Sequence, residues 1–149
     1  WGYRIIPRGG RKPGQRLELI FEGIDCRPGG RLGAFGLGGG GAAGLEIDRA
    51  DHALGTPPNA IVLASSKRHT DIYLMTPEDL LDPTPDMTGT QSDAVRSDLV
   101  YFRNERGGAV FSVGSIAWAG AMAWHGYDNE VSRLTWNVLK RFQQRNDGT

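Results

Sequence analysis

The chain has 149 residues, with 17 basic and 17 acidic side chains and a formal net charge of zero. This balance argues against a nucleic-acid-binding protein, whose contact surface is basic, and against a polybasic membrane anchor. No stretch approaches the roughly 18 apolar residues of a membrane-spanning helix, and the 39% of hydrophobic residues are enough for one core. We therefore expect one domain or a piece of one, with no nucleic-acid or membrane partner.

The chain begins at Trp1 rather than at a methionine, which favours a fragment of a longer protein. Its single cysteine, Cys26, allows no internal disulfide, which fits a reducing compartment. We expect residues 1–149 to form a single domain or domain fragment of a cytoplasmic protein.

The first half of the chain predicts strands around a glycine-rich loop. Residues 17–22 alternate between apolar and polar with one lapse, which indicates a strand. The glycine tract at 36–44 also carries apolar residues, so we expect an ordered loop close to other backbone or to a ligand. A short apolar run at 60–64 predicts a strand covered on both faces. Residues 71–75 form a weaker second strand pattern, and a helix start follows at 76–79.

The second half has the clearest patterns. Residues 98–102 and 109–113 read as strands on either side of a turn, which predicts an antiparallel hairpin. We expect them to share one mixed sheet with the strand at 60–64. A helix is predicted from about 129 to 144 and should pack one apolar face on that sheet. The residues of this face are Val131, Leu134, Val138 and Phe142.

The known catalytic and metal-binding motifs that we considered are absent from this sequence or incomplete in it. Residues 36–41 satisfy G-x-G-x-x-G, but no strand precedes them and no helix follows, which argues against dinucleotide binding. The sequence G-S-I-A at 114–117 lacks the second glycine of a nucleophile elbow. His69 and Asp71 offer two ligands, yet no compact metal-binding set forms around them. We therefore predict no metal ligand in this chain.

Glu46 is the acid whose surroundings most favour chemistry. It follows the glycine tract directly, and alternation places its side chain on the face opposite those of Leu45 and Ile47. A carboxylate beside a loop that lets substrate approach the backbone is a candidate general base or water-orienting group. The alternative is a glutamate that is solvated or paired with Arg49.

Three segments carry a family resemblance. They are G-L-E-I-D-R-A-D at 44–51 with L-G-T-P-P at 54–58, I-V-L-A-S-S at 61–66, and G-A-V-F-S-V-G-S-I-A-W at 108–118, which continues through N-E-V-S-R-L-T at 129–135 and N-V-L-K-R-F at 137–142. Together they resemble the C-terminal region of the N,N-dimethylformamidase large (beta) subunit family. The resemblance covers about residues 40–142.

The resemblance implies a fold and a reaction. The fold is an α/β glutamine-amidotransferase-like layer fold without its cysteine nucleophile, with a mixed β-sheet, flanking helices and Gly-rich loops. The reaction is hydrolysis of small N-substituted formamides, such as N,N-dimethylformamide to dimethylamine and formate, by metal-assisted attack of water. Glu46 matches the glutamate that the family uses near the metal, which makes it the candidate catalytic residue.

The resemblance also implies a cofactor and partners. The cofactor is iron, held by two tyrosines and a glutamate upstream of the region that this chain covers. No tyrosine of this chain is assigned as an iron ligand, because none matches a ligand motif of the family. These tyrosines are Tyr3, Tyr73, Tyr101 and Tyr127. The expected partners are a small amide substrate and a small accessory subunit in a homo-oligomer.

Two other functions remain open. The first is a non-catalytic binding or assembly module, because a Gly-rich apolar loop and four tryptophans can form an interface. The second is a sugar-binding module that uses tryptophans as stacking platforms. Trp118 and Trp124 are the candidates to line an apolar pocket, although a core position is the stronger expectation for Trp118.

Overall fold

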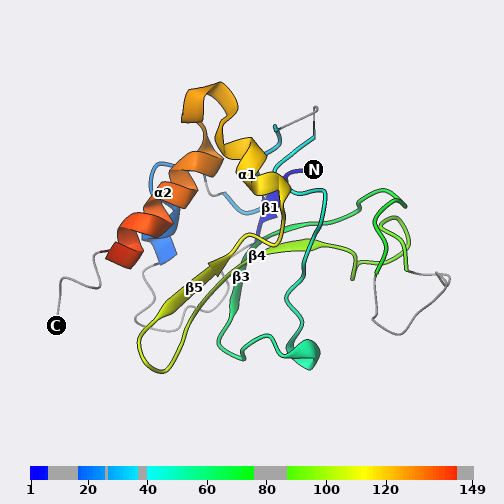
Figure 1. Ribbon diagram of the computed structural model, residues 1–149, viewed down its shortest axis with the longest axis horizontal. Helices are drawn as coiled ribbons and strands as arrows, with labels where there is room; N and C mark the ends of the chain where they lie inside the picture. Colours follow the sequence, from blue (N-terminus) through cyan, green and yellow to red (C-terminus); the bar gives the residue numbers. More distant parts are fainter. Residues whose placement is uncertain (7–16, 26, 37–39, 76–86, 144–149) are drawn as a thin grey trace.

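One sheet of five antiparallel strands lies at the centre of the described residues (Figure 1). The computed structural model describes residues 1–6, 17–25, 27–36, 40–75 and 87–143. The strand order is β2-β1-β3-β4-β5. The strands are β1 (Tyr3–Ile5), β2 (Arg31–Leu32), β3 (Ile61–Ser66), β4 (Ser97–Arg103) and β5 (Ala109–Ser112).

Short helical segments connect and cover the strands. The two α-helices lie on the same side of the sheet (Figure 1). The helical elements are η1 (Leu17–Phe21), η3 (His52–Leu54), α1 (Ala117–Met122), η4 (Trp124–Tyr127) and α2 (Glu130–Gln143). The architecture therefore combines α and β structure, while the glutamine-amidotransferase-like layering stays a prediction.

The three predicted sheet strands are confirmed, and their expected mixed arrangement is wrong. β4 and β5 form the predicted hairpin, with Val100 opposite Ser112 and Arg103 opposite Ala109. β3 pairs with β4, but every pairing among the described strands is antiparallel. Sequence analysis missed β1 and β2, because strands of three and two residues are too short to show a period.

The strand predicted at 17–22 is the 3-10 helix η1. Ile20 and Phe21 are adjacent and both buried, whereas a strand buried on one face alone would alternate between buried and exposed residues. The Asn137 side-chain amide donates to the carbonyl oxygens of Ile20 (3.2 Å) and Glu22 (2.9 Å). Helix α2 thereby satisfies backbone groups that a neighbouring strand would otherwise satisfy.

The strand predicted at 71–75 is a turn. The Tyr73 amide donates to the Thr70 carbonyl at 3.0 Å, and only Leu74 forms an isolated bridge, to Thr88. Ile72 is 82% exposed, so its apolar side chain does not belong to a buried face. The helix start expected at 76–79 lies outside the described residues.

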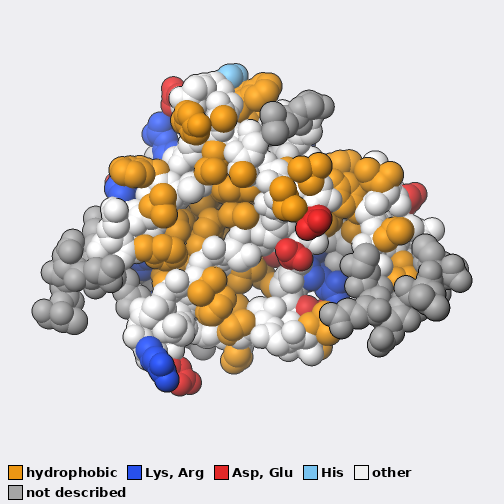
Figure 2. Space-filling model, in the orientation of Figure 1, with side chains coloured by type: hydrophobic (Ala, Val, Ile, Leu, Met, Phe, Trp, Pro, Cys, Tyr) orange, Lys and Arg blue, Asp and Glu red, His pale blue; other side chains and the backbone are white. Residues whose placement is uncertain are grey.

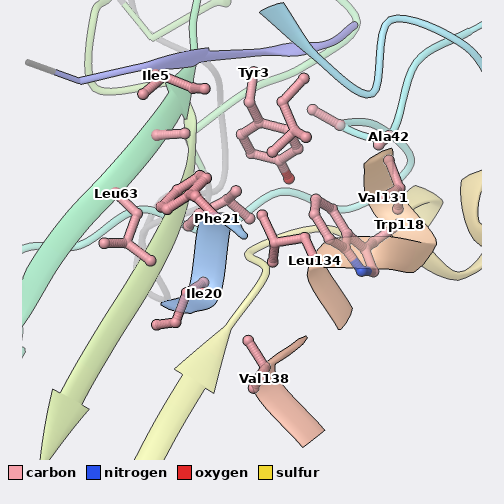
Figure 3. Packing of buried hydrophobic residues seen from close by; sticks show 14 of the residues in the cluster. Tyr3, Ile5, Ile20, Phe21, Ala42, Leu63, Trp118, Val131, Leu134 and Val138 are labelled. Atoms are coloured by element: carbon pink, nitrogen blue, oxygen red, sulfur yellow. The ribbon is translucent and has the colours of Figure 1, made fainter. Parts of the chain in front are cut away.

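Helix α2 follows its prediction closely. Asn129 caps its start, where its side-chain oxygen accepts the Ser132 amide at 2.9 Å. The predicted apolar face points into the core, with Phe142 partly buried beside it. Figure 3 shows part of this core, which β1, β3, η1, α1 and α2 build together. Its labelled members are Tyr3, Ile5, Ile20, Phe21, Ala42, Leu63, Trp118, Val131, Leu134 and Val138.

Gly114 lets the segment after the glycine tract lie against the sheet. The Asp48 amide donates to the Gly114 carbonyl at 2.9 Å, and the Asp98 amide donates to the Asp48 carbonyl at 3.0 Å. Gly114 has a φ of 58°, and a Cβ there would lie 2.7 Å from both the Asp48 and Asp98 carbonyl oxygens. The position therefore combines a left-handed backbone with a close approach of three backbone segments.

Replacing Gly114 by Ala is expected to lower the free energy of unfolding by about 2 kcal/mol or more, since left-handed strain adds to the clash. Gly29→Ala is the matched control, because Gly29 has a φ of 77° with nothing within 4 Å of the added Cβ. Urea unfolding of both variants separates the two contributions. An equal loss of unfolding free energy in both variants would show that the clash of the added Cβ at Gly114 contributes nothing.

No helix among the described residues is long and apolar enough to cross a membrane.

Candidate functional site

The glycine tract lies against the backbone of the residues before β1 and of the loop after β2. The Ala43 amide donates to the Trp1 carbonyl, and the Ala42 amide to the Gly33 carbonyl, both at 2.8 Å. A Cβ on Gly41 would lie 1.9 Å from the Trp1 carbonyl oxygen, so only glycine fits there. The expected ordered loop close to other backbone is therefore confirmed for residues 40–44, while 37–39 lie outside the described residues.

Two side-chain hydroxyls fix the end of this tract. The Ser115 hydroxyl accepts the Gly44 amide at 2.9 Å and donates to the Gly44 carbonyl at 3.0 Å. The Tyr73 hydroxyl accepts the Leu45 amide at 2.9 Å. One residue further, the Glu46 carbonyl accepts the Ile116 amide at 3.3 Å. The backbone around Glu46 is thus held from both sides.

Leu45 has an unusual conformation. Its φ of 66° is left-handed, a region that costs a residue with a side chain about 1–2 kcal/mol. Its side chain is 71% exposed, whereas Ile47 is partly buried. The expectation that Leu45 and Ile47 share one face is therefore wrong, because the left-handed turn at Leu45 interrupts the alternation of a strand.

The Glu46 side chain is exposed. Within the described residues its carboxylate makes no hydrogen bond or ion pair, whereas Arg49 pairs with Asp51 at 2.9 Å. The alternative of a glutamate paired with Arg49 is therefore wrong, and a solvated carboxylate is what the structure shows. A water or substrate can reach it directly.

Two hollows lined by described residues lie away from Glu46. One, of about 610 Å³, lies between the end of η1 and helix α2 and includes Glu22 and Trp136. The other, of about 500 Å³, includes Arg68 and Asp93. Neither hollow includes Glu46, whose side chain is exposed.

Three rings pack beside the Glu46 segment. The His69 ring centroid lies 5.0 Å from that of Trp1 and 4.9 Å from that of Tyr73. His69 is fully buried, and its Nε2 lies 3.2 Å from the Ser66 carbonyl, to which it donates. Its Nδ1 has no hydrogen-bond partner among the described atoms. Burial lowers the pKa of His69, so the imidazole is neutral near pH 7.

This burial predicts a pH dependence of stability. The unfolded chain binds a proton at His69 near pH 6.5, whereas folded His69 resists protonation because its pKa is lowered. The contribution of neutral His69 to the free energy of unfolding should therefore be complete above about pH 6.5, and the free energy of unfolding should fall as the pH drops below that value. Urea unfolding at several pH values should show this fall in the His52→Gln control but much less of it in His69→Gln. An equal fall in both variants would contradict the assignment.

His69 and Asp71 do not form the ligand pair that the sequence left open. The Asp71 carboxylate accepts the Thr90 amide at 3.2 Å and also the Thr90 hydroxyl, while His69 is buried among rings. Among the described residues, no group of three or more His, Cys, Asp and Glu side chains lies together closely enough to hold a metal ion.

Sequence analysis missed a buried polar junction around Asp98 on β4. The Asp98 carboxylate accepts the Ser65 hydroxyl (2.5 Å), the Ala50 amide (2.9 Å) and Arg96 Nε (2.9 Å). The Arg96 guanidinium also donates to the Ala50 carbonyl at 2.9 Å. The junction therefore ties the segment that follows Glu46 to the sheet. The sequence signal for this junction is an acid at the start of a predicted strand, two residues after an arginine.

Tyr3 is a structural tyrosine. Its hydroxyl lies 2.7 Å from the Ser97 hydroxyl and donates to the Val113 carbonyl at 2.7 Å. Burial raises the pKa of Tyr3 to about 12. The phenol therefore stays protonated and joins β1 to β4 and to the residue after β5.

The two candidate pocket tryptophans differ. Trp118 is 4% exposed, and its indole nitrogen donates to the Thr135 hydroxyl at 3.0 Å, which confirms its core position. Trp124 is 39% exposed and stacks on Phe35, with the ring centroids 6.2 Å apart. Trp118 is therefore not available as a stacking platform.

Comparison with known proteins identifies the family. The model of the family described as N,N-dimethylformamidase beta subunit-like, C-terminal, matches residues 4–129. An N,N-dimethylformamidase beta subunit from Alcaligenes sp is 48% identical over 128 residues, which are 86% of this chain and 16% of that protein. The corresponding subunit from Paracoccus aminophilus is 48% identical over 130 residues, 87% of this chain and 17% of that protein. The chain thus spans about a sixth of these relatives' length, and it belongs to the N,N-dimethylformamidase beta subunit-like, C-terminal family.

Proposed function

We propose that this chain is part of the large subunit of an amidohydrolase that hydrolyses small N-substituted formamides. In that reaction N,N-dimethylformamide and water give dimethylamine and formate, and Glu46 transfers the proton. Two relatives named N,N-dimethylformamidase beta subunit support the reaction class. The observation that carries the role of Glu46 is its exposed carboxylate on a backbone held by the Ser115 and Tyr73 hydroxyls.

The chemistry requires a group that moves a proton. Water attacks the amide carbonyl carbon and must lose a proton as the new C–O bond forms. The amine leaves as the C–N bond breaks and must gain a proton. A carboxylate can accept the first proton and deliver the second, and this kind of catalysis contributes about a hundred- to ten-thousand-fold in rate.

Iron remains part of the proposal for the parent subunit. No group of three or more His, Cys, Asp and Glu side chains lies together among the described residues, and we propose that the iron ligands come from other parts of that subunit. No step of the mechanism is assigned to the metal here, and Glu46 is placed only as the group that moves the proton.

The partners are also proposed. The relatives are named as beta subunits, which supports a complex with a second, small subunit. We propose the same arrangement for this protein, within a homo-oligomer in the cytoplasm.

A non-catalytic assembly module is the second candidate function. Figure 2 shows hydrophobic side chains spread over the visible face, and several apolar side chains are mainly exposed, among them Leu45 (71%), Leu54 (76%) and Ile72 (82%). Exposed apolar side chains that form one contiguous patch are typical of an interface with another protein. Turnover by the parent subunit carrying Glu46→Gln decides between the two, because an assembly module does not need this carboxylate.

A further inference from the structure

The direction of Glu46 is set by the residue before it. Leu45 has a φ of 66°, a conformation that side-chain-bearing residues rarely adopt. If Leu45 returned to an ordinary extended or helical conformation, the chain that follows would turn and the Glu46 carboxylate would point elsewhere. Some feature of the fold must therefore hold Leu45 in place.

We propose that Ser115 and Tyr73 are positioning residues that hold Leu45 left-handed and thereby aim Glu46. This inference rests on the proposed role of Glu46 as the group that moves the proton. Neither hydroxyl is proposed to touch substrate, since both are engaged with backbone atoms.

The Ser115 hydroxyl acts as a two-point clamp on Gly44. It accepts the Gly44 amide at 2.9 Å, donates to the Gly44 carbonyl at 3.0 Å and accepts the Ala117 amide at 3.2 Å. A hydroxyl has one proton to donate and two lone pairs to accept with, so these contacts use its full capacity. Ser115 therefore ties the residue before Leu45 to the start of helix α1 and has no proton left for chemistry.

The Tyr73 hydroxyl holds the next amide. It accepts the Leu45 N–H at 2.9 Å. Its ring packs against those of His69 and Trp1, with centroid distances of 4.9 Å and 5.6 Å, so the hydroxyl is presented from a packed cluster. A Cβ on Gly44 would lie 3.1 Å from this hydroxyl, so glycine there gives the hydroxyl room to reach the backbone.

The two holds come from different elements. Tyr73 lies in the turn after β3, whereas Ser115 lies between β5 and α1. They meet on the consecutive residues Gly44 and Leu45, directly before Glu46. A carboxylate that must reach a substrate at hydrogen-bond distance benefits from such fixation, because a misplacement of about 1 Å can cost about a hundredfold in rate.

The test uses the complete parent subunit with any accessory subunit it carries. Tyr73→Phe removes only a hydroxyl, and Ser115→Ala removes the other. Each variant is expected to lower kcat for N,N-dimethylformamide by about ten- to a hundredfold with KM nearly unchanged. Tyr101→Phe is the matched control, because it removes a hydroxyl bonded to Arg141 at 3.5 Å, and its kcat should stay within about twofold of wild type.

Double variants separate positioning from a general structural effect. Once Glu46→Gln has removed the proton-transferring group, adding Tyr73→Phe should lower kcat no further, because Tyr73 acts only through Glu46. A further loss equal to that of Tyr73→Phe alone would overturn the positioning role. If Glu46→Gln lowers turnover while Tyr73→Phe and Ser115→Ala do not, the positioning role fails and the proposed function stands. Wild-type turnover in Glu46→Gln would overturn the proposed function, and the positioning role with it.

Hydrogen exchange tests, independently of catalysis, whether the Tyr73 hydroxyl holds the backbone at Leu45. In the parent subunit, Tyr73→Phe should raise amide exchange in the peptide that contains residues 44–47 and leave the β4 and β5 peptides unchanged. Unchanged exchange at 44–47 would show that the Tyr73 hydroxyl does not hold Leu45, and the proposal would be wrong whatever the turnover.

Discussion

Replacing Glu46 by Gln in the parent subunit is expected to lower turnover of N,N-dimethylformamide by about a hundred- to ten-thousand-fold, the usual contribution of general acid–base catalysis. Glutamine keeps the shape of the side chain and removes the proton acceptor. The fold should not suffer, because the Glu46 side chain is exposed and makes no hydrogen bond or ion pair within the described residues. The thermal midpoint and the bound iron are therefore expected to match those of wild type.

Asp48→Asn is the matched control for Glu46→Gln. Asp48 is an exposed acid two residues away, and its carboxylate plays no part in the proposed step. Its turnover should stay close to that of wild type. A comparable loss in both variants would point to a general effect of local charge. Loss of turnover together with thermal stability in Glu46→Gln would indicate a structural role for this carboxylate.

Replacing Leu134 by Ala is expected to lower the free energy of unfolding by about 2–5 kcal/mol. Leu134 is fully buried on helix α2 and belongs to the core that also contains Tyr3 and Trp118 (Figure 3). Truncation removes apolar burial and leaves a cavity between the helix and its neighbours. Urea unfolding gives the difference directly.

Leu139→Ala provides the control for this measurement on the same helix. Leu139 is 49% exposed, so its loss should cost about 0.5 kcal/mol or less. If Leu134→Ala cost no more than Leu139→Ala, the assignment of the buried face of α2 would be wrong.

Local patterns predicted those parts of the fold that depend on neighbouring residues. The hairpin of β4 and β5 joins strands separated by one short turn, and α2 carries its buried face in its own 3.6-residue period. The strand expected at 17–22 is wrong, because the packing of this segment depends on Asn137, far along the chain. Local patterns do not predict β1 or its pairing with β3 either, because β1 has three residues and its partner lies about 60 positions further along the chain.

The candidate site divides in the same way. The position of Glu46 directly after the glycine tract is visible in the sequence, and so is the motif that includes Ser115. The left-handed conformation of Leu45 cannot be predicted from the sequence, because leucine has no preference for it. This conformation is held by the Tyr73 hydroxyl, and the sequence predicts a weak strand around Tyr73 where the structure has a turn.

The bonds of Tyr3 have a consequence for how the chain reaches its fold. This residue bonds to Ser97 and Val113, which lie 94 and 110 positions further along the chain. β1 also lies inside the sheet, between β2 and β3, rather than at its edge. The sheet therefore cannot close until most of the chain is present, and the entropy of closing such long loops is lost before the contacts form. We expect folding in milliseconds to seconds, as is usual for domains dominated by distant strand pairings.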